Sequence, residues 1–211
     1  MIESPVSSPS VRPASFITVV SGLPRSGTSM MMKMLRAAGM SLLTDNLRGA
    51  DMDNPNGYYE FERVKNLPHG DQDWLAQAAG KAVKIVAPIL PYLPPGYEYR
   101  VLFMRRTLRE IVSSQDKMLE RRGEHPVLPD DELERLLEKQ LLQVDAWMRN
   151  QADIHRLDVH YNRLLLDPDP VLPEICRFLG GTLEATAMRN VINPGLYRQR
   201  VDAAAEPVVQ P

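Results

Sequence analysis

The hydrophobic pattern of the chain contains two kinds of segment. Short apolar runs predict strands, because a parallel strand buried on both faces reads as a continuous apolar run. In other segments, apolar residues recur every three or four positions, which is the spacing of one helix face. The predicted strands cover residues 16–21, 82–87, 99–104 and 154–160. The predicted helices lie after residue 28 and at residues 73–79, 108–121, 130–151 and 170–179. Strands that alternate with helices predict a three-layer α/β fold, in which a parallel sheet carries helices on both faces.

The apolar faces of the predicted helices identify core residues. Met30, Met31, Met34 and Leu35 recur at three- and four-residue spacing after the first strand, which favours core packing over a metal or cofactor site. The single cysteine, Cys176, lies in another apolar helical stretch and is predicted to be a buried thiol. On the longest helix, the predicted apolar stripe consists of Leu133, Leu136, Leu137, Leu141 and Val144.

Length and charge narrow the class of protein. The chain has 211 residues and a formal net charge of −2, so it offers no basic surface for nucleic acid or an anionic membrane. No apolar run approaches the ~20 residues that span a bilayer, and the first residues do not form a cationic, apolar secretion signal. We therefore expect one cytoplasmic domain at residues 15–200, with a flexible leader at 1–14 and a flexible tail at 201–211. The oligomeric state stays open.

A glycine-containing loop follows the first predicted strand. It reads GLPRSGT, from Gly22 to Thr28, and a predicted helix comes directly after it. A helix N-terminus offers unpaired N–H groups and the positive end of the helix dipole, so this loop is predicted to bind a phosphate group. Nucleotide hydrolases and kinases follow the second glycine of such a loop with Lys. Here Gly27 is followed by Thr28 and Ser29, and the positive charge is carried by Arg25 instead.

Two arginines, Arg105 and Arg106, follow the third predicted strand. The carboxyl ends of parallel strands meet at one edge of a sheet, where ligands bind. We therefore expect the two arginines near the glycine loop. A nucleotide hydrolase would place a magnesium-holding Asp at such a strand end. The sequence offers no obvious magnesium ligand there, so we expect no metal requirement.

Two of these segments resemble sequence signatures of sulfotransferases, which use 3′-phosphoadenosine 5′-phosphosulfate (PAPS). The loop PRSGTS resembles the 5′-phosphosulfate loop of that family. The segment VLFMRRTLREIVSSQ resembles the 3′-phosphate signature, in which an Arg at a strand end is followed by a Ser eight residues later. Arg106 and Ser114 have this separation and are the favoured pair. Arg105 and Ser113 have it too and stay open, because neighbouring strand residues point to opposite faces. Leu108 replaces the usual Pro of the signature.

A third segment, VHYNRLLLDPDPVLPEICRFLGG at residues 159–181, resembles the late segment of the same family. The matches span residues 16–180 and imply a small, bacterial-type sulfotransferase with a fold related to P-loop nucleotide kinases. The implied reaction moves a sulfuryl group from PAPS to a hydroxyl or amine and releases adenosine 3′,5′-bisphosphate (PAP). The acceptor, whether a small molecule, a carbohydrate or a lipid, is not identified by the resemblance.

The resemblance also implies roles for individual residues. Nucleotide binding is assigned to Gly22, Pro24, Arg25, Ser26, Gly27, Thr28, Ser29, Arg106, Ser114 and Arg198. Arg25 is assigned to catalysis as well, because its charge can stabilise the leaving phosphate. The acceptor must lose a proton, and the base in this family is a Glu or a His. Glu60, within NPNGYYEFE, is the first candidate, followed by Glu62 and His69. A C-terminal basic segment that closes over the 3′-phosphate is matched by Tyr197, Arg198 and Arg200.

Two other functions stay open at the level of sequence. One is a small-molecule kinase that uses ATP and magnesium, which the missing Lys after Gly27 disfavours. The other is a non-catalytic nucleotide-binding protein of the same fold. The absence of a clear base in the sequence leaves room for this second function.

Overall fold

The computed structural model describes residues 16–45, 47, 49, 51, 54, 57–193 and 195. In this part of the chain, four parallel strands form one sheet in the order β2-β1-β3-β4. The strands are β1 (Ile17–Gly22), β2 (Ala82–Lys84), β3 (Tyr99–Arg105) and β4 (Ile154–His160). Gly22 pairs with Met104, and Arg105 pairs with His160. The carboxyl ends of β1, β3 and β4 therefore meet at one edge of the sheet.

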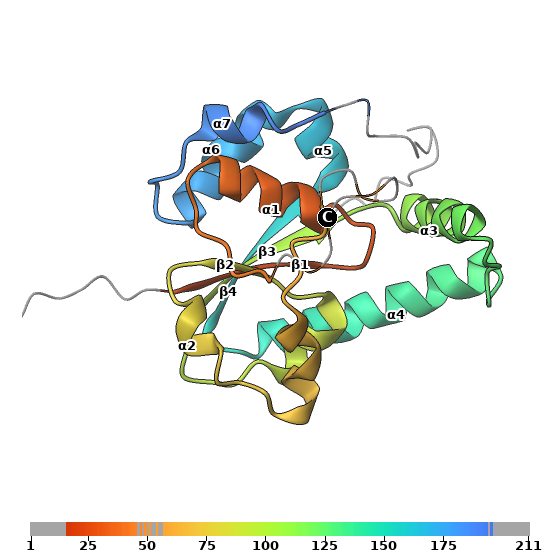
Figure 1. The fold of residues 1–211 in the computed structure, drawn as a ribbon, viewed down its shortest axis with the longest axis horizontal. Helices are drawn as coiled ribbons and strands as arrows, with labels where there is room; N and C mark the ends of the chain where they lie inside the picture. Colours follow the sequence, from red (N-terminus) through yellow and green to blue (C-terminus); the bar gives the residue numbers. More distant parts are fainter. Residues whose placement is uncertain are drawn as a thin grey trace, which may run out of the picture.

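Helices cover both faces of the sheet, which confirms the predicted three-layer α/β fold (Figure 1). One face carries α1 (Thr28–Ala37), α5 (Tyr161–Leu166), α6 (Pro168–Phe178) and α7 (Ala185–Arg189). The other face carries the 3₁₀ helices η1 (Glu62–His69) and η2 (Ala87–Tyr92), together with α2 (Leu75–Ala78) and α4 (Asp130–Arg149). The remaining helix, α3 (Leu108–Arg122), packs against α4.

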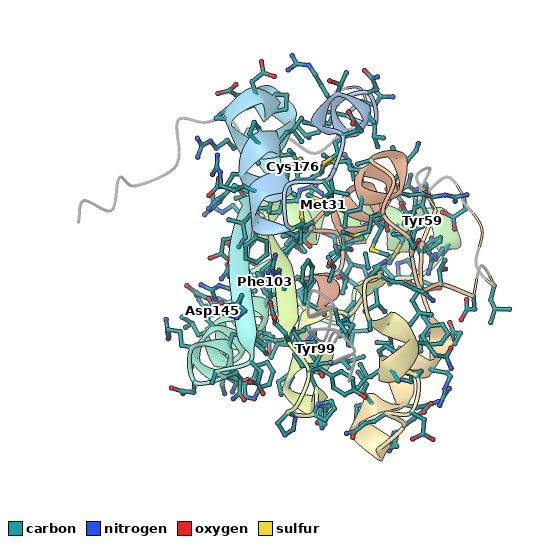
Figure 2. The ribbon with its side chains drawn as sticks, turned by 90° about the vertical axis from the view of Figure 1, so that its left-hand side faces the viewer. Met31, Tyr59, Tyr99, Phe103, Asp145 and Cys176 are labelled. Carbon is teal, nitrogen blue, oxygen red and sulfur yellow. The ribbon has the colours of Figure 1, made fainter. Side chains whose placement is uncertain are left out.

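The two faces of the sheet form two separate hydrophobic clusters. Successive strand residues point to opposite faces, so Val20 joins the cluster under α1 whereas Val19 joins the cluster over α4. The methionines of α1 are buried, as predicted, and pack with α6 and α7. Figure 2 shows Met31 and Cys176 together in this layer. Cys176 is buried, which confirms the prediction, and this burial raises the pKa of its thiol.

Several predicted boundaries are wrong. The second strand ends at Lys84 instead of residue 87, and the 3₁₀ helix η2 begins at Ala87. The helix predicted at residues 73–79 contains only the four residues of α2. Neither α5 nor α7 was predicted, because segments of five or six residues are too short for a helical period to appear.

The predicted apolar stripe of α4 is only partly buried. Of its residues only Val144 is fully buried, and Leu136 is 54% exposed. The reason is that α4 extends past the sheet together with α3 (Figure 1), so its N-terminal half has fewer elements to pack against. None of the helices that the structure describes is long and apolar enough to cross a membrane. The predicted leader, the predicted tail and Arg198 lie outside the described residues.

Candidate active site at the carboxyl edge of the sheet

The glycine loop connects β1 to α1 through three residues with left-handed backbone angles. Gly22, Arg25 and Gly27 have φ values of 146°, 70° and 100°. A Cβ atom on Gly22 would lie 2.5 Å from Ser26 Oγ and 2.8 Å from the Met104 carbonyl oxygen. A Cβ atom on Gly27 would collide with the Tyr161 ring. Both glycines are therefore required by close packing as well as by φ.

The loop ends at the first turn of α1. Thr28 and Ser29 form this turn, and both are buried. The carbonyl of Gly27 accepts the first helical bond from Met31, which leaves the N–H groups of the first turn for a ligand. Ser26 is also buried, and its hydroxyl oxygen has no hydrogen-bond partner among the described residues. This oxygen faces Gly22 beneath the loop, so the role of Ser26 in nucleotide binding stays a prediction.

Arg25 and Ser114, two residues assigned to the nucleotide, are in direct contact. Arg25 Nε donates a hydrogen bond to Ser114 Oγ at 3.0 Å. Ser114 lies on α3 and is buried. The structure therefore brings the predicted 5′-phosphosulfate loop and the predicted 3′-phosphate signature together, although these residues are far apart in the sequence.

Arg106 reaches the same loop from the end of β3. Its Nη1 atom donates to the carbonyl oxygen of Arg25 at 2.9 Å, and its Nε atom donates to Glu110 Oε2 at 2.9 Å. The guanidinium also lies 4.7 Å from the centre of the Tyr161 ring. Burial raises the pKa of Tyr161, while the nearby Arg106 opposes that rise. The Tyr161 ring is therefore a neutral surface that packs against both Arg106 and Gly27.

Arg105 points to the opposite face of the sheet, toward α4. Its Nη2 atom lies 2.5 Å from Asp145, and its Nε atom lies 3.2 Å from Asp158. Figure 2 shows Asp145 on the side of the sheet away from Met31. Arg156 pairs with the same two aspartates, at 2.9 and 3.0 Å. The geometry thus joins Arg106 to the loop and places Arg105 in an ion-pair network with α4.

Lys84, which the sequence analysis missed, lies at the end of β2 with only 9% of its side chain exposed. Its Nζ atom lies 3.4 Å from Ser29 Oγ and donates to the Tyr58 carbonyl oxygen at 3.1 Å. Ser29 Oγ also accepts a hydrogen bond from Asn54 Nδ2 at 2.7 Å. The one available sequence signal is that Lys84 is the only charged residue in the predicted strand at residues 82–87.

Glu60, the first candidate base, lies next to Lys84. Its Oε1 atom is 3.7 Å from Lys84 Nζ, and its side chain is 25% exposed. The partly buried carboxylate is therefore held near the first turn of α1 by a cation that is almost fully buried. Glu62 pairs with Lys65 and is 44% exposed, and His69 lies exposed at the end of η1. Among the three candidates, only Glu60 has a contact that connects it to the loop region.

Comparisons with known proteins show which solved structures have a similar fold. No family model matches the sequence, and no curated protein matches it. The structure is similar to the sulfotransferase domain of the curacin biosynthetic pathway, with a TM-score of 0.51 and 16% identity, over 84% of this chain and 78% of that domain. It is also similar to the sulfotransferase domain of the Synechococcus PCC 7002 olefin synthase, with a TM-score of 0.50 and 16% identity, over 96% of this chain and 94% of that one.

A mouse sulfotransferase solved in complex with PAP matches with a TM-score of 0.50 and 15% identity, over 86% of this chain and 63% of the mouse chain. At identities this low, the structural similarity shows a shared fold and does not show the reaction. The parallel sheet, the glycine loop after β1 and the helices on both faces agree with these comparisons. The chain has the fold of the sulfotransferase domains.

Proposed function

We propose that this protein is a sulfotransferase that transfers a sulfuryl group from PAPS to a hydroxyl or amine of an acceptor. The observation that carries the proposal is the presence of two cations beside the glycine loop and the start of α1. Arg25 is oriented by Ser114 of α3, and Lys84 approaches Ser29 from β2. Cations beside a glycine loop and a helix N-terminus favour a ligand with several negative charges.

The residues of the loop fit the 5′ end of such a nucleotide. Gly22, Pro24, Arg25, Ser26, Gly27, Thr28 and Ser29 are proposed to hold it, since the start of α1 offers backbone N–H groups and the left-handed glycines shape the turn into that helix. Arg106 and Ser114 are proposed for the 3′-phosphate. The same proposal extends to Arg198. The acceptor is proposed to be a small molecule, a carbohydrate or a lipid.

In this proposal the acceptor atom forms a bond to sulfur while the bond from sulfur to the 5′-phosphate oxygen breaks. The electron pair of the broken bond remains on the phosphate, and the acceptor proton moves to Glu60. Arg25 and Lys84 stabilise the negative charge of the leaving phosphate. Because the transition state of such transfers is loose, positioning and charge stabilisation account for most of the catalysis.

A binding experiment without metal tests the nucleotide. PAP is added to the protein in EDTA, and the melting temperature is measured. A ligand at ~100 times its dissociation constant adds about 2.7 kcal/mol to stability, which corresponds to roughly 5–10 °C for a domain of this size. ATP with magnesium serves as the comparison.

A larger shift with ATP and magnesium than with PAP would overturn the proposal in favour of a kinase. Turnover separates an enzyme from a non-catalytic nucleotide-binding protein. The release of PAP from PAPS is measured by chromatography, with water or an added alcohol as the acceptor. The rate of release is expected to be higher with the protein than without it. PAP binding with no measurable release under any acceptor would support a binding protein.

A further inference from the structure

A buried carboxylate lies behind the glycine loop. Glu110, in the first turn of α3, is 1% exposed. Its Oε2 atom accepts from Arg106 Nε at 2.9 Å, and its Oε1 atom accepts from Asn162 Nδ2 at 3.0 Å. The Arg106 side chain is itself only 7% exposed. Glu110 therefore joins the end of β3 to α5, which follows β4.

The contacts continue from Glu110 into the loop. Arg106 uses a second nitrogen, Nη1, to donate to the carbonyl oxygen of Arg25. Arg25 has a φ of 70°, a left-handed conformation that costs energy for a residue with a side chain. A strained residue of this kind persists only when its surroundings hold it. The Arg106 guanidinium is one such surrounding group, and Glu110 fixes the plane of that guanidinium.

We propose that Glu110 is a positioning residue, which orients Arg106 and through it holds the loop at Arg25 in the shape that binds an anion. In this arrangement Arg25 Nε donates to Ser114 Oγ, and the Ser26 N–H donates to the Leu23 carbonyl oxygen within the loop. The identity of the anion, PAP, rests on the proposed function. The positioning itself rests on the contacts of Glu110, Arg106 and Asn162.

A purely structural role is the main alternative. Glu110 neutralises a buried arginine, and breaking a buried ion pair is strongly destabilising whether or not the pair serves a site. A buried ion pair is, however, weak evidence for stability by itself, because the desolvation of two charges offsets much of their attraction. The two roles predict different results, since a structural role changes stability and a positioning role also changes anion affinity in the folded protein.

The test compares Glu110→Gln with Glu120→Gln, an exposed glutamate on the same helix. Both variants and the wild type are titrated with PAP and, separately, with inorganic pyrophosphate by calorimetry, and their unliganded melting temperatures are recorded. Glu110→Gln is expected to weaken binding of both probes about 10- to 100-fold, the loss associated with a charge-assisted hydrogen bond. Glu120→Gln is expected to change affinity by less than about twofold.

A double-mutant cycle shows whether Glu110 acts through Arg106. In an Arg106→Ala background, Glu110→Gln is expected to have less than about a twofold further effect on affinity. Asn162→Ala removes the hydrogen bond from Asn162 to Glu110 and supplies a milder variant if Glu110→Gln does not fold. It is expected to weaken binding less than Glu110→Gln and in the same direction.

Several outcomes would overturn the inference. Lower melting temperatures with unchanged affinity in Glu110→Gln and Asn162→Ala would assign Glu110 a structural role only. Additive effects of Glu110→Gln and Arg106→Ala would also contradict it. Wild-type protein that binds pyrophosphate but not PAP would overturn the proposed function and leave the positioning test valid. Wild-type protein that binds neither would overturn both.

Discussion

Replacement of Lys84 by methionine is the most informative test of the proposed chemistry. Methionine has a similar length and no charge, so the variant removes the cation that lies 3.4 Å from Ser29 Oγ in the first turn of α1. Two unit charges at about 4 Å interact by about 4 kcal/mol at an effective dielectric constant of about 20. Glu60 lies 3.7 Å from the same Nζ atom and partly neutralises it, so the full value is an upper bound.

The expected loss in turnover lies within this upper bound of about 4 kcal/mol. Loss of one preorganised group that stabilises transition-state charge typically lowers kcat by about 10²- to 10³-fold, or about 2.7–4 kcal/mol. The expected loss in folding stability is smaller, about 1 kcal/mol or less, because Glu60 is 25% exposed and water can replace its partner. Lys84→Met should therefore remain folded while losing most of its turnover.

The assay is release of PAP from PAPS at saturating nucleotide, with water or an alcohol as acceptor. Lys139→Met, which removes an exposed lysine from α4, is the matched control and should retain wild-type turnover. PAP affinity, measured separately, should fall much less than kcat in Lys84→Met if the cation acts mainly on charge that develops during transfer. Wild-type turnover in a folded Lys84→Met variant would refute this reasoning.

The remaining predictions concern the two arginines and the base. Arg25→Ala should mainly lower kcat, whereas Arg106→Ala should mainly weaken PAP binding, each by about 1.5–3 kcal/mol; equal effects of both variants on both parameters would show that the roles are misassigned. Glu60→Gln should retain its fold and PAP affinity but lose ~100-fold or more in turnover, as expected for a general base. Glu62→Gln, whose parent carboxylate pairs with Lys65, is the control and should lose far less; the opposite ranking would move the base to Glu62.

The sheet and the loop could be predicted because their signals are local. Residues of β1 pack alternately into the cluster under α1 and the cluster over α4, so every position of the strand is apolar or small. The turn into α1 requires left-handed backbone at Gly22 and Gly27, which a sequence displays directly as glycine. In both cases the structural cause lies within a few residues of its consequence.

The pair of Lys84 and Glu60 could not be predicted in the same way. Lys84 becomes part of the site only because β2 pairs with β1, which places Lys84 beside Val20. Glu60 precedes η1, and its backbone carbonyl is held by the Thr44 hydroxyl at 2.8 Å, so its position depends on a long-range contact. The neighbouring Tyr59 has a φ of 51°, which breaks the simple alternation of an extended segment. The sequence pattern therefore identified Glu60 as a candidate but not Lys84, the cation that lies beside it.

The sequence does not distinguish the roles of Arg105 and Arg106, whereas the structure places their side chains on different faces of the sheet. Each arginine is followed by a serine eight residues later, so both fit the same signature. Arg105 still belongs to β3 and pairs with His160 of β4, so its side chain emerges on the α4 face, where Asp145 and Asp158 neutralise it. Arg106 follows the strand and turns to the loop. On the loop side, Arg106 pairs instead with the buried Glu110. The face that each guanidinium occupies favours the proposed assignment of the 3′-phosphate to Arg106, and the affinity of Arg106→Ala for PAP will test it.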